Sequence, residues 1–101
     1  MIELMDDQQT HAALAEHPHW ELRDSTLVRA VQAPDFTTGI RLVDEVAATA
    51  EVMNHHPDID IRWTTVTFAL STHSAGGVTA ADVELAGRID GIVDEIVAAA
   101  G

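Results

Sequence analysis

The chain has 101 residues, 47% of them hydrophobic, and no repeat or linker divides it, so we predict a single domain over residues 1–101. Its 17 acidic and 5 basic residues give a net charge of −12, which argues against direct binding to nucleic acid. Cysteine is absent, which excludes disulfides, thiolate metal sites and cysteine nucleophiles. No apolar run reaches the roughly 18–20 residues of a membrane span, and the acidic start does not resemble a signal peptide, so a cytoplasmic protein is expected.

The first half of the chain predicts a helix, a hairpin and a second helix. Residues 6–16 have the pattern of a short helix, which a histidine–proline pair ends. Residues 20–33 predict two short strands around a polar turn at 23–25. The second helix starts after Asp35 and carries an apolar stripe at spacings of three and four. This stripe comprises Phe36, Ile40, Val43, Val46, Ala50 and Met53.

The second half predicts another hairpin and a final helix. Alternating apolar residues Ile59, Ile61 and Trp63 are typical of a half-buried strand. Residues 66–70 alternate with the opposite parity, which predicts a turn near residues 64–65. Thr79 followed three residues later by Asp82 resembles a capping box that begins the last helix. The apolar face of this helix comprises Val83, Ala86, Ile89, Val93 and Ile96.

This order of elements predicts the fold class. Helix, two strands, helix, two strands and helix form an α+β, two-layer α-β-β-α-β-β-α arrangement. The strands make a four-stranded antiparallel sheet, and the helices pack on one face of it. The other face or an edge of the sheet would then be available for self-association.

Three histidines suggest an acid–base site. His55 and His56 are adjacent and precede Pro57 at the end of the second helix, while His73 ends the last predicted strand. Histidine exchanges protons near neutral pH, and the carbonyl end of a helix favours protonated imidazole. Glu51 stands four residues before His55, so both are expected to share a helix face, where the carboxylate would orient the ring. Imidazoles converging on one pocket could supply an acid and a base.

Simpler interpretations of these residues stay open. A histidine pair before proline is also a polar helix stop, and a lone histidine at a strand end is more often a surface residue. Asp82 is more typical of a first helical turn than of catalysis. Three histidines could also hold zinc, although adjacent side chains converge poorly on one ion. His11, His17 and His19 fit no pattern and are predicted to lie at the surface.

One sequence pattern resembles that of the pterin-4a-carbinolamine dehydratases. The residues that carry the resemblance are Glu51, Asn54, His55, His56, Pro57, Trp63, Val66, Leu70, Ser71, Thr72, His73 and Asp82, with Phe36 at the start of the second helix. The resemblance extends from about Trp20 to Ile96. It implies the same α-β-β-α-β-β-α order that the residue pattern predicts.

The resemblance implies an activity without a metal or cofactor. Such an enzyme removes water from a 4a-hydroxytetrahydropterin to give quinonoid dihydropterin, in tetrahydrobiopterin recycling. His55, His56 and His73 match the family's functional histidines: the first two are expected to protonate or position the leaving hydroxyl, and His73 to serve the N5 side. The substrate-binding residues that we predict are Glu51, Asn54, Pro57 and the backbone of Ser71 and Thr72. A homodimer or homotetramer is also implied.

Two positions depart from the family pattern. Asn54 stands where aspartate is frequent, and Ile59 stands where an aromatic residue is usual. The second departure keeps open a related pterin substrate, such as one of molybdopterin metabolism. A different class of function is a non-catalytic dimerisation cofactor of a transcription factor, because animal members of the family have that role. The complete set of three histidines favours the enzyme.

Overall fold

The computed structural model describes residues 3–100 and shows the predicted order of elements. The helices and strands are α1 (Asp7–Leu14), β1 (Glu21–Arg23), β2 (Thr26–Gln32), α2 (Phe36–Met53), β3 (Asp58–Arg62), β4 (Thr65–Leu70) and α3 (Ala80–Val93). A 3-10 turn, η1 (His73–Ala75), precedes α3, and a π-helical segment, η2 (Asp94–Ala98), continues it. Within residues 3–100, none of the helices is both long and apolar enough to cross a membrane.

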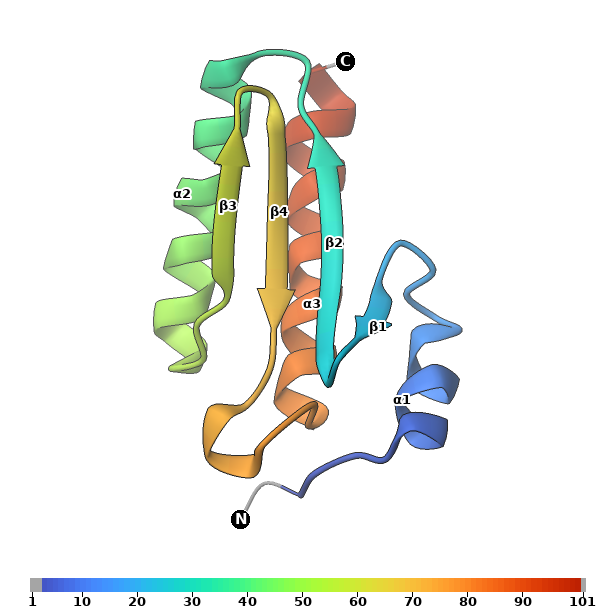
Figure 1. Cartoon of the computed structure of the whole chain (residues 1–101). Coiled ribbons are helices and arrows are strands. Elements are labelled where there is room, and N and C mark those ends of the chain that lie inside the picture. Colours follow the sequence, from blue (N-terminus) through green and yellow to red (C-terminus); the bar gives the residue numbers. More distant parts are fainter. Residues whose placement is uncertain (1–2, 101) are drawn as a thin grey trace.

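The four strands form one antiparallel sheet in the order β1-β2-β4-β3. Figure 1 shows α2 and α3 side by side behind this sheet, while α1 lies beside β1 at its edge. The predicted α+β fold with a four-stranded antiparallel sheet is therefore confirmed. The long helices α2 and α3 cover one face, as expected for a two-layer structure.

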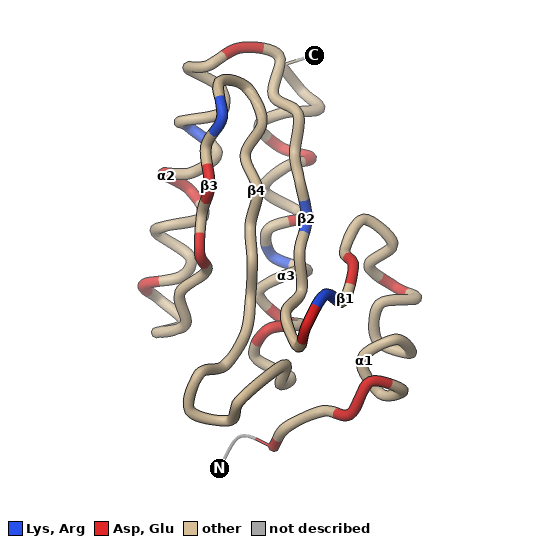
Figure 2. The backbone as a smooth tube through the Cα atoms, viewed as in Figure 1, with Lys and Arg blue, Asp and Glu red and all other residues tan. Residues whose placement is uncertain are grey.

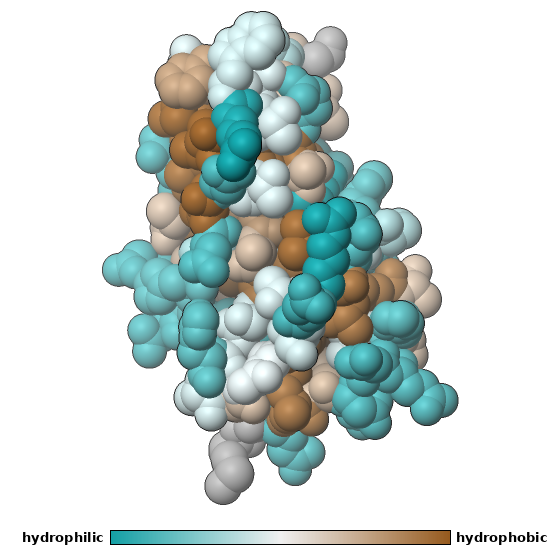
Figure 3. All heavy atoms as spheres, in the orientation of Figure 1, coloured by the Kyte–Doolittle hydropathy of each residue, from teal (hydrophilic) through white to brown (hydrophobic). Residues whose placement is uncertain are grey.

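The core lies between the sheet and the helix pair α2–α3. Alternate residues of β4 face it, and each is almost completely buried: Val66, Phe68 and Leu70. The other face of the sheet carries the intervening small residues, and in Figure 3 it appears as a pale band between charged side chains. Burying each large apolar side chain contributes about 1.5–3 kcal/mol, so the β4 stripe anchors the fold.

The buried stripes of the two long helices differ from the predicted ones by a small rotation. Phe36 is exposed because it lies in the first turn of α2, at the rim of the sheet, so its predicted place in the core is wrong. Leu42 is fully buried, and with Val46 and Ala50 it forms a row at spacing four. In α3, Leu85 is likewise fully buried beside the predicted core residues. The sequence pattern had missed both leucines.

The two hairpins close through two-residue turns without glycine. Asp24 and Ser25 both have positive φ, 46° and 63°, as a tight hairpin turn of this length requires. The second turn is Trp63–Thr64, one residue earlier than predicted, because Arg62 pairs with Thr65. Trp63 has φ 50° and is 80% exposed, so its predicted place in a half-buried strand is wrong.

A polar cluster on Asp90 ties the start of the sheet to α3. Its carboxylate accepts hydrogen bonds from Trp20 Nε1 at 2.8 Å and from the Arg29 guanidinium, and it lies 3.4 Å from His17 Nδ1. His17 is therefore half-buried, and its predicted surface location is wrong. His11 and His19 are exposed, as predicted.

Candidate active site

The end of α2 directs His55 away from the helix. Asn54 adopts the left-handed conformation, φ 51°, and the backbone N–H of His55 donates to the Ala50 carbonyl at 3.0 Å. This six-residue closure is typical of a Schellman motif, and asparagine tolerates the left-handed backbone better than most residues. His55 and His56 therefore lie just beyond the end of α2.

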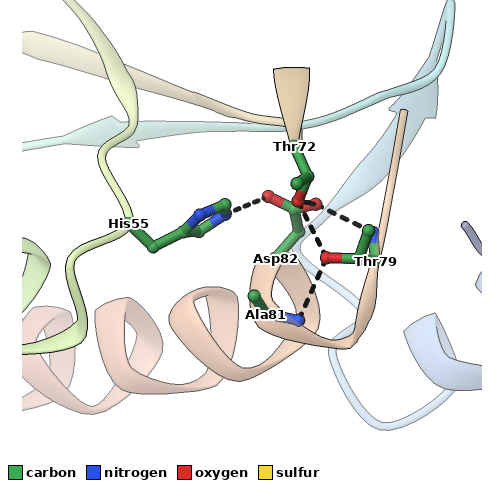
Figure 4. A network of polar contacts seen from close by, with 5 residues as sticks. All are labelled: His55, Thr72, Thr79, Ala81 and Asp82. Carbon is green, nitrogen blue, oxygen red and sulfur yellow. Dashed lines mark hydrogen bonds and ion pairs between the residues drawn. The ribbon is translucent and has the colours of Figure 1, made fainter. Parts of the chain in front are cut away.

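His55 pairs with a buried carboxylate of α3. Its Nε2 atom lies 2.6 Å from Asp82 Oδ1, the His55 side chain is 15% exposed, and Asp82 is completely buried (Figure 4). The prediction that Glu51 orients the His55 ring is wrong, because His55 pairs with Asp82 and Glu51 pairs with His56. The spacing of four places two residues on one face only while the helix continues, and the left-handed residue at 54 ends it.

Asp82 has further partners on the other oxygen of its carboxylate. Oδ2 accepts hydrogen bonds from the Thr72 hydroxyl at 2.8 Å and from the backbone N–H of Thr79 at 2.9 Å. The predicted capping box of Thr79 and Asp82 is confirmed. Its contact with His55 was not predicted from the residue pattern, because that pattern cannot show which distant side chain faces a helix cap.

His56 makes a separate pair with Glu51. The two side chains are hydrogen-bonded through His56 Nε2 and Glu51 Oε2, and both are largely exposed. Solvent screens such a pair, so its contribution to stability is small. Pro57 follows, half-buried, and leads directly into β3. The adjacent histidines thus differ: one contacts a buried carboxylate and the other an exposed one.

His73 begins η1 in a compact loop after β4. Thr72 donates its backbone N–H to the Gly77 carbonyl at 2.8 Å and accepts from Ala75 N at 3.0 Å, so these backbone groups are paired within the loop. Gly76 has φ 80°, which favours glycine. The His73 side chain is exposed and makes no hydrogen bond within the described range, 3–100, and Ser71 is half-buried beside it.

Three segments distant in sequence meet at one end of the sheet. Figure 1 shows the end of α2, the end of β4 and the start of α3 at this end, and Asp82 contacts residues from the first two. Figure 2 shows no charged residue between β4 and the first turn of α3, so charges at the site come from the ends of the two helices. Within residues 3–100, no cluster of three metal-ligating side chains occurs.

A hollow of about 330 Å³ lies on the neighbouring side of the loop after β4. Its lining residues come from the N-terminal segment, β1, the first hairpin turn and the loop: Leu4, Met5, Asp6, Asp7, Thr10, Leu22, Ser25, Gly76, Gly77 and Val78. None of the three histidines lines it. The hollow is therefore separate from the pair of His55 and Asp82.

The site favours proton transfer chemistry. An ionised carboxylate only accepts hydrogen bonds, so each Nε2 atom of His55 and His56 carries hydrogen toward its carboxylate. In both rings Nδ1 is then left to exchange a proton. Two imidazoles that each pair with a carboxylate have the chemistry that general acid–base catalysis requires.

Comparison with known proteins identifies the family. The family model described as "Pterin 4 alpha carbinolamine dehydratase" matches residues 3–92, and the chain belongs to this family. A protein of Nocardia farcinica assigned as a pterin-4-alpha-carbinolamine dehydratase is 54% identical over 88 residues, covering 87% of this chain and 93% of the relative. A Mycobacterium protein (strain KMS) with the same assignment is 52% identical over 91 residues, covering 90% and 97%.

Solved structures share the fold. The crystal structure of a transcriptional coactivator/pterin dehydratase from Brucella melitensis is 28% identical, with a TM-score of 0.84, and covers 87% of this chain and 96% of that one. A pterin dehydratase-like protein described as a RuBisCO assembly factor of the α-carboxysome is 22% identical, with a TM-score of 0.60, and covers 72% and 84%. The second likeness concerns the fold alone.

Proposed function

We propose that the chain performs the dehydratase reaction of its family, as a hydro-lyase that removes water from a 4a-hydroxytetrahydropterin in tetrahydrobiopterin recycling. The observation that carries the proposal is the pairing of His55 with buried Asp82, next to His56, in a chain whose family match spans residues 3–92. Relatives of 54% and 52% identity that share this assignment support the same activity.

The reaction needs one acid and one base. The bond between C4a and its hydroxyl oxygen breaks, and a proton delivered to that oxygen lets it leave as water. The proton on N5 is removed, and the electron pair of the N5–H bond forms the double bond between N5 and C4a. No electrons are gained or lost overall, so two positioned imidazoles suffice.

The three histidines have distinct proposed roles. His55 and His56 protonate or position the leaving hydroxyl, and His73 takes the proton from N5. Support for a charge-changing role is strongest at His55, because the Asp82 carboxylate can hold the ring orientation and stabilise the imidazolium that forms. The His73 side chain is exposed, so it is accessible to a bound pterin and to solvent, which suits a base that acts on N5.

Other predicted substrate contacts remain part of the proposal. Glu51 and Asn54 are exposed at the end of α2, Pro57 begins the segment before β3, and Ser71 lies at the end of β4. These residues surround the histidines in sequence and can offer a carboxylate, an amide and backbone groups to a pterin ring. For Thr72, the backbone N–H and carbonyl are paired within the loop and the hydroxyl is buried against Asp82, which argues against a direct contact with the pterin ring.

Self-association as a homodimer or homotetramer is also proposed. Brown atoms lie along the side of β3 and α2 in Figure 3. Large apolar side chains are exposed on α2, on the edge strand β3 and in the turn after it: Phe36, Val52, Ile61 and Trp63. Sedimentation equilibrium should show a mass that is a multiple of 10.9 kDa, and a monomer at micromolar concentration would contradict the proposal. The expected cytoplasmic location is tested by cell fractionation.

The activity is tested with freshly generated 4a-hydroxytetrahydropterin, whose dehydration is followed by ultraviolet absorbance. Wild type should accelerate dehydration, and His56→Ala/His73→Ala should lose this activity, because removing an acid–base group typically costs about 10²–10⁴ in rate. His11→Ala, an exposed histidine of α1, is the matched control and should match wild type. Folded wild type without acceleration would reject the dehydratase and favour a non-catalytic partner role.

A further inference from the structure

Thr72 places a buried hydroxyl between two elements of the site. Its Oγ1 atom lies 2.8 Å from Asp82 Oδ2 and 2.8 Å from Thr79 Oγ1, and the residue is buried. Figure 4 shows Thr72 directly above the Asp82 carboxylate, while His55 approaches the carboxylate from the side. The hydroxyl therefore contacts the same carboxylate that holds the histidine.

The hydrogen bonds of this network have one consistent direction. The backbone N–H groups of Thr79 and Ala81 can only donate, and they donate to Asp82 Oδ2 at 2.9 Å and to Thr79 Oγ1 at 3.3 Å. A threonine hydroxyl has a single hydrogen, so Thr79 can donate to Thr72 while Thr72 donates to Asp82. Such a chain of hydroxyls strengthens each bond in it.

The carboxylate then receives donors on both oxygens. Thr72 and the Thr79 backbone saturate Oδ2, and Oδ1 is left for His55 Nε2 at 2.6 Å. An acceptor-only carboxylate with these donors requires hydrogen on His55 Nε2.

We propose that Thr72 is a positioning residue of the active site, whose hydroxyl keeps the Asp82 carboxylate as an acceptor and so fixes His55 with hydrogen on Nε2 and Nδ1 directed to the substrate. This inference rests on the proposed dehydratase function. It makes Nδ1 the atom of His55 that exchanges the proton. Thr72 also immediately precedes His73, so one residue links the His55–Asp82 pair to the loop of the third histidine.

A purely structural role of Thr72 makes different predictions. The same hydroxyl belongs to the polar network at the start of α3, and its loss would lower stability in either case. A structural role leaves the protonation pattern of His55 unchanged in the folded protein. The hydrogen position on the His55 ring therefore separates the two roles.

The test is histidine ¹⁵N NMR on the full chain, combined with steady-state kinetics. Wild-type His55 should carry hydrogen on Nε2, and Thr72→Val, which keeps the shape but removes the hydroxyl, should shift its ring toward a mixture of forms. Its kcat should fall about 10–100-fold, the effect of one hydrogen bond to a charged group, with a smaller change in KM. Thr72→Ser should restore both readouts.

Thr67→Val is the matched control, because Thr67 lies on β4, the strand that leads to Thr72, but on the open face of the sheet. It should match wild type in both readouts.

A neutral wild-type His55 with hydrogen on Nδ1 would overturn the positioning role, as would an unchanged spectrum and kcat in Thr72→Val. If Thr72→Val does not fold, the hydrogen position on the His55 ring is compared in wild type and Thr72→Ser. Hydrogen on Nε2 in both supports the positioning role, and hydrogen on Nδ1 in either overturns it. Wild type that is inactive on the pterin would overturn the dehydratase function, whereas the NMR result tests Thr72 independently.

Discussion

The backbone of Asn54 decides where the first two histidines lie. Its left-handed conformation ends α2 and turns His55 toward Asp82. The resemblance to the family suggested a substrate contact for this side chain, and the structure supplies a conformational reason for asparagine as well. At the residue scale, the two roles can be separated by substitution.

Asn54→Ala should lower the free energy of unfolding by about 1 kcal/mol, because alanine resists the left-handed backbone. Asn54→Gly should retain or increase stability, since glycine adopts φ 51° without strain. Urea unfolding followed by circular dichroism measures both. Equal stability of the two variants would show that the backbone conformation is not what selects asparagine here.

The glycine variant also isolates the substrate contact. It preserves the helix end while removing the amide, so full dehydratase activity in Asn54→Gly would remove Asn54 from the predicted substrate contacts. A raised KM with unchanged kcat would support a binding role, because it indicates the loss of ground-state binding to the substrate.

At the scale of elements, a side-chain cap fixes where α2 begins. Asp35 caps α2, and its side chain accepts a hydrogen bond from the Thr38 backbone at 2.7 Å. Hydrogen bonding by the Thr38 side chain, then by its backbone, with a smaller contribution from Arg41, holds the pKa of Asp35 below its ordinary value of 3.8. The cap is therefore stronger when the carboxylate is ionised.

This lowered pKa makes the cap pH-dependent. The stabilisation by Asp35 should be fully present above pH 3.8 and should be lost as the pH falls through the lower pKa of the folded state. Asp35→Asn retains a capping oxygen but does not titrate, so wild type should lose its advantage over this variant in acid. Urea unfolding at about pH 6 and about pH 2.5 measures the difference. A difference that is constant with pH would contradict the assignment.

The elements themselves could be predicted from apolar spacing and cap residues, but their exact faces and partners could not. Trp63 continues the alternation of β3, yet the turn begins there because Arg62 pairs with Thr65 and leaves residues 63 and 64 to close the hairpin. Leu42 was missed because several apolar stripes fit one helix. The partner of Asp82 depends on how α2 and α3 pack, and sequence spacing carries no such information.

At the scale of the whole molecule, Asp90 joins the start of the sheet to the helix layer. Arg29 is 10% exposed and Asp90 22% exposed, so their ion pair is shielded from most solvent. The same carboxylate accepts from the Trp20 indole. Removal of Asp90 would leave two buried donors without a partner.

Asp90→Ala should therefore lower the free energy of unfolding by about 1–3 kcal/mol. Asp94→Ala, which removes an exposed carboxylate one turn later, is the control and should change stability by less than about 0.5 kcal/mol. Chemical unfolding of both variants provides the comparison. Similar small effects in both would show that the Asp90 cluster contributes little to the fold.

The pair of His55 and Asp82 is the centre of the proposed site, so the most direct measurement is dehydration of 4a-hydroxytetrahydropterin by wild type and Asp82→Asn. The amide keeps the size of the carboxylate but cannot stabilise an imidazolium, so we predict folded protein with a rate reduced about 10²–10⁴-fold. Near-normal turnover by folded Asp82→Asn would contradict the central claim that this buried carboxylate drives proton transfer through His55.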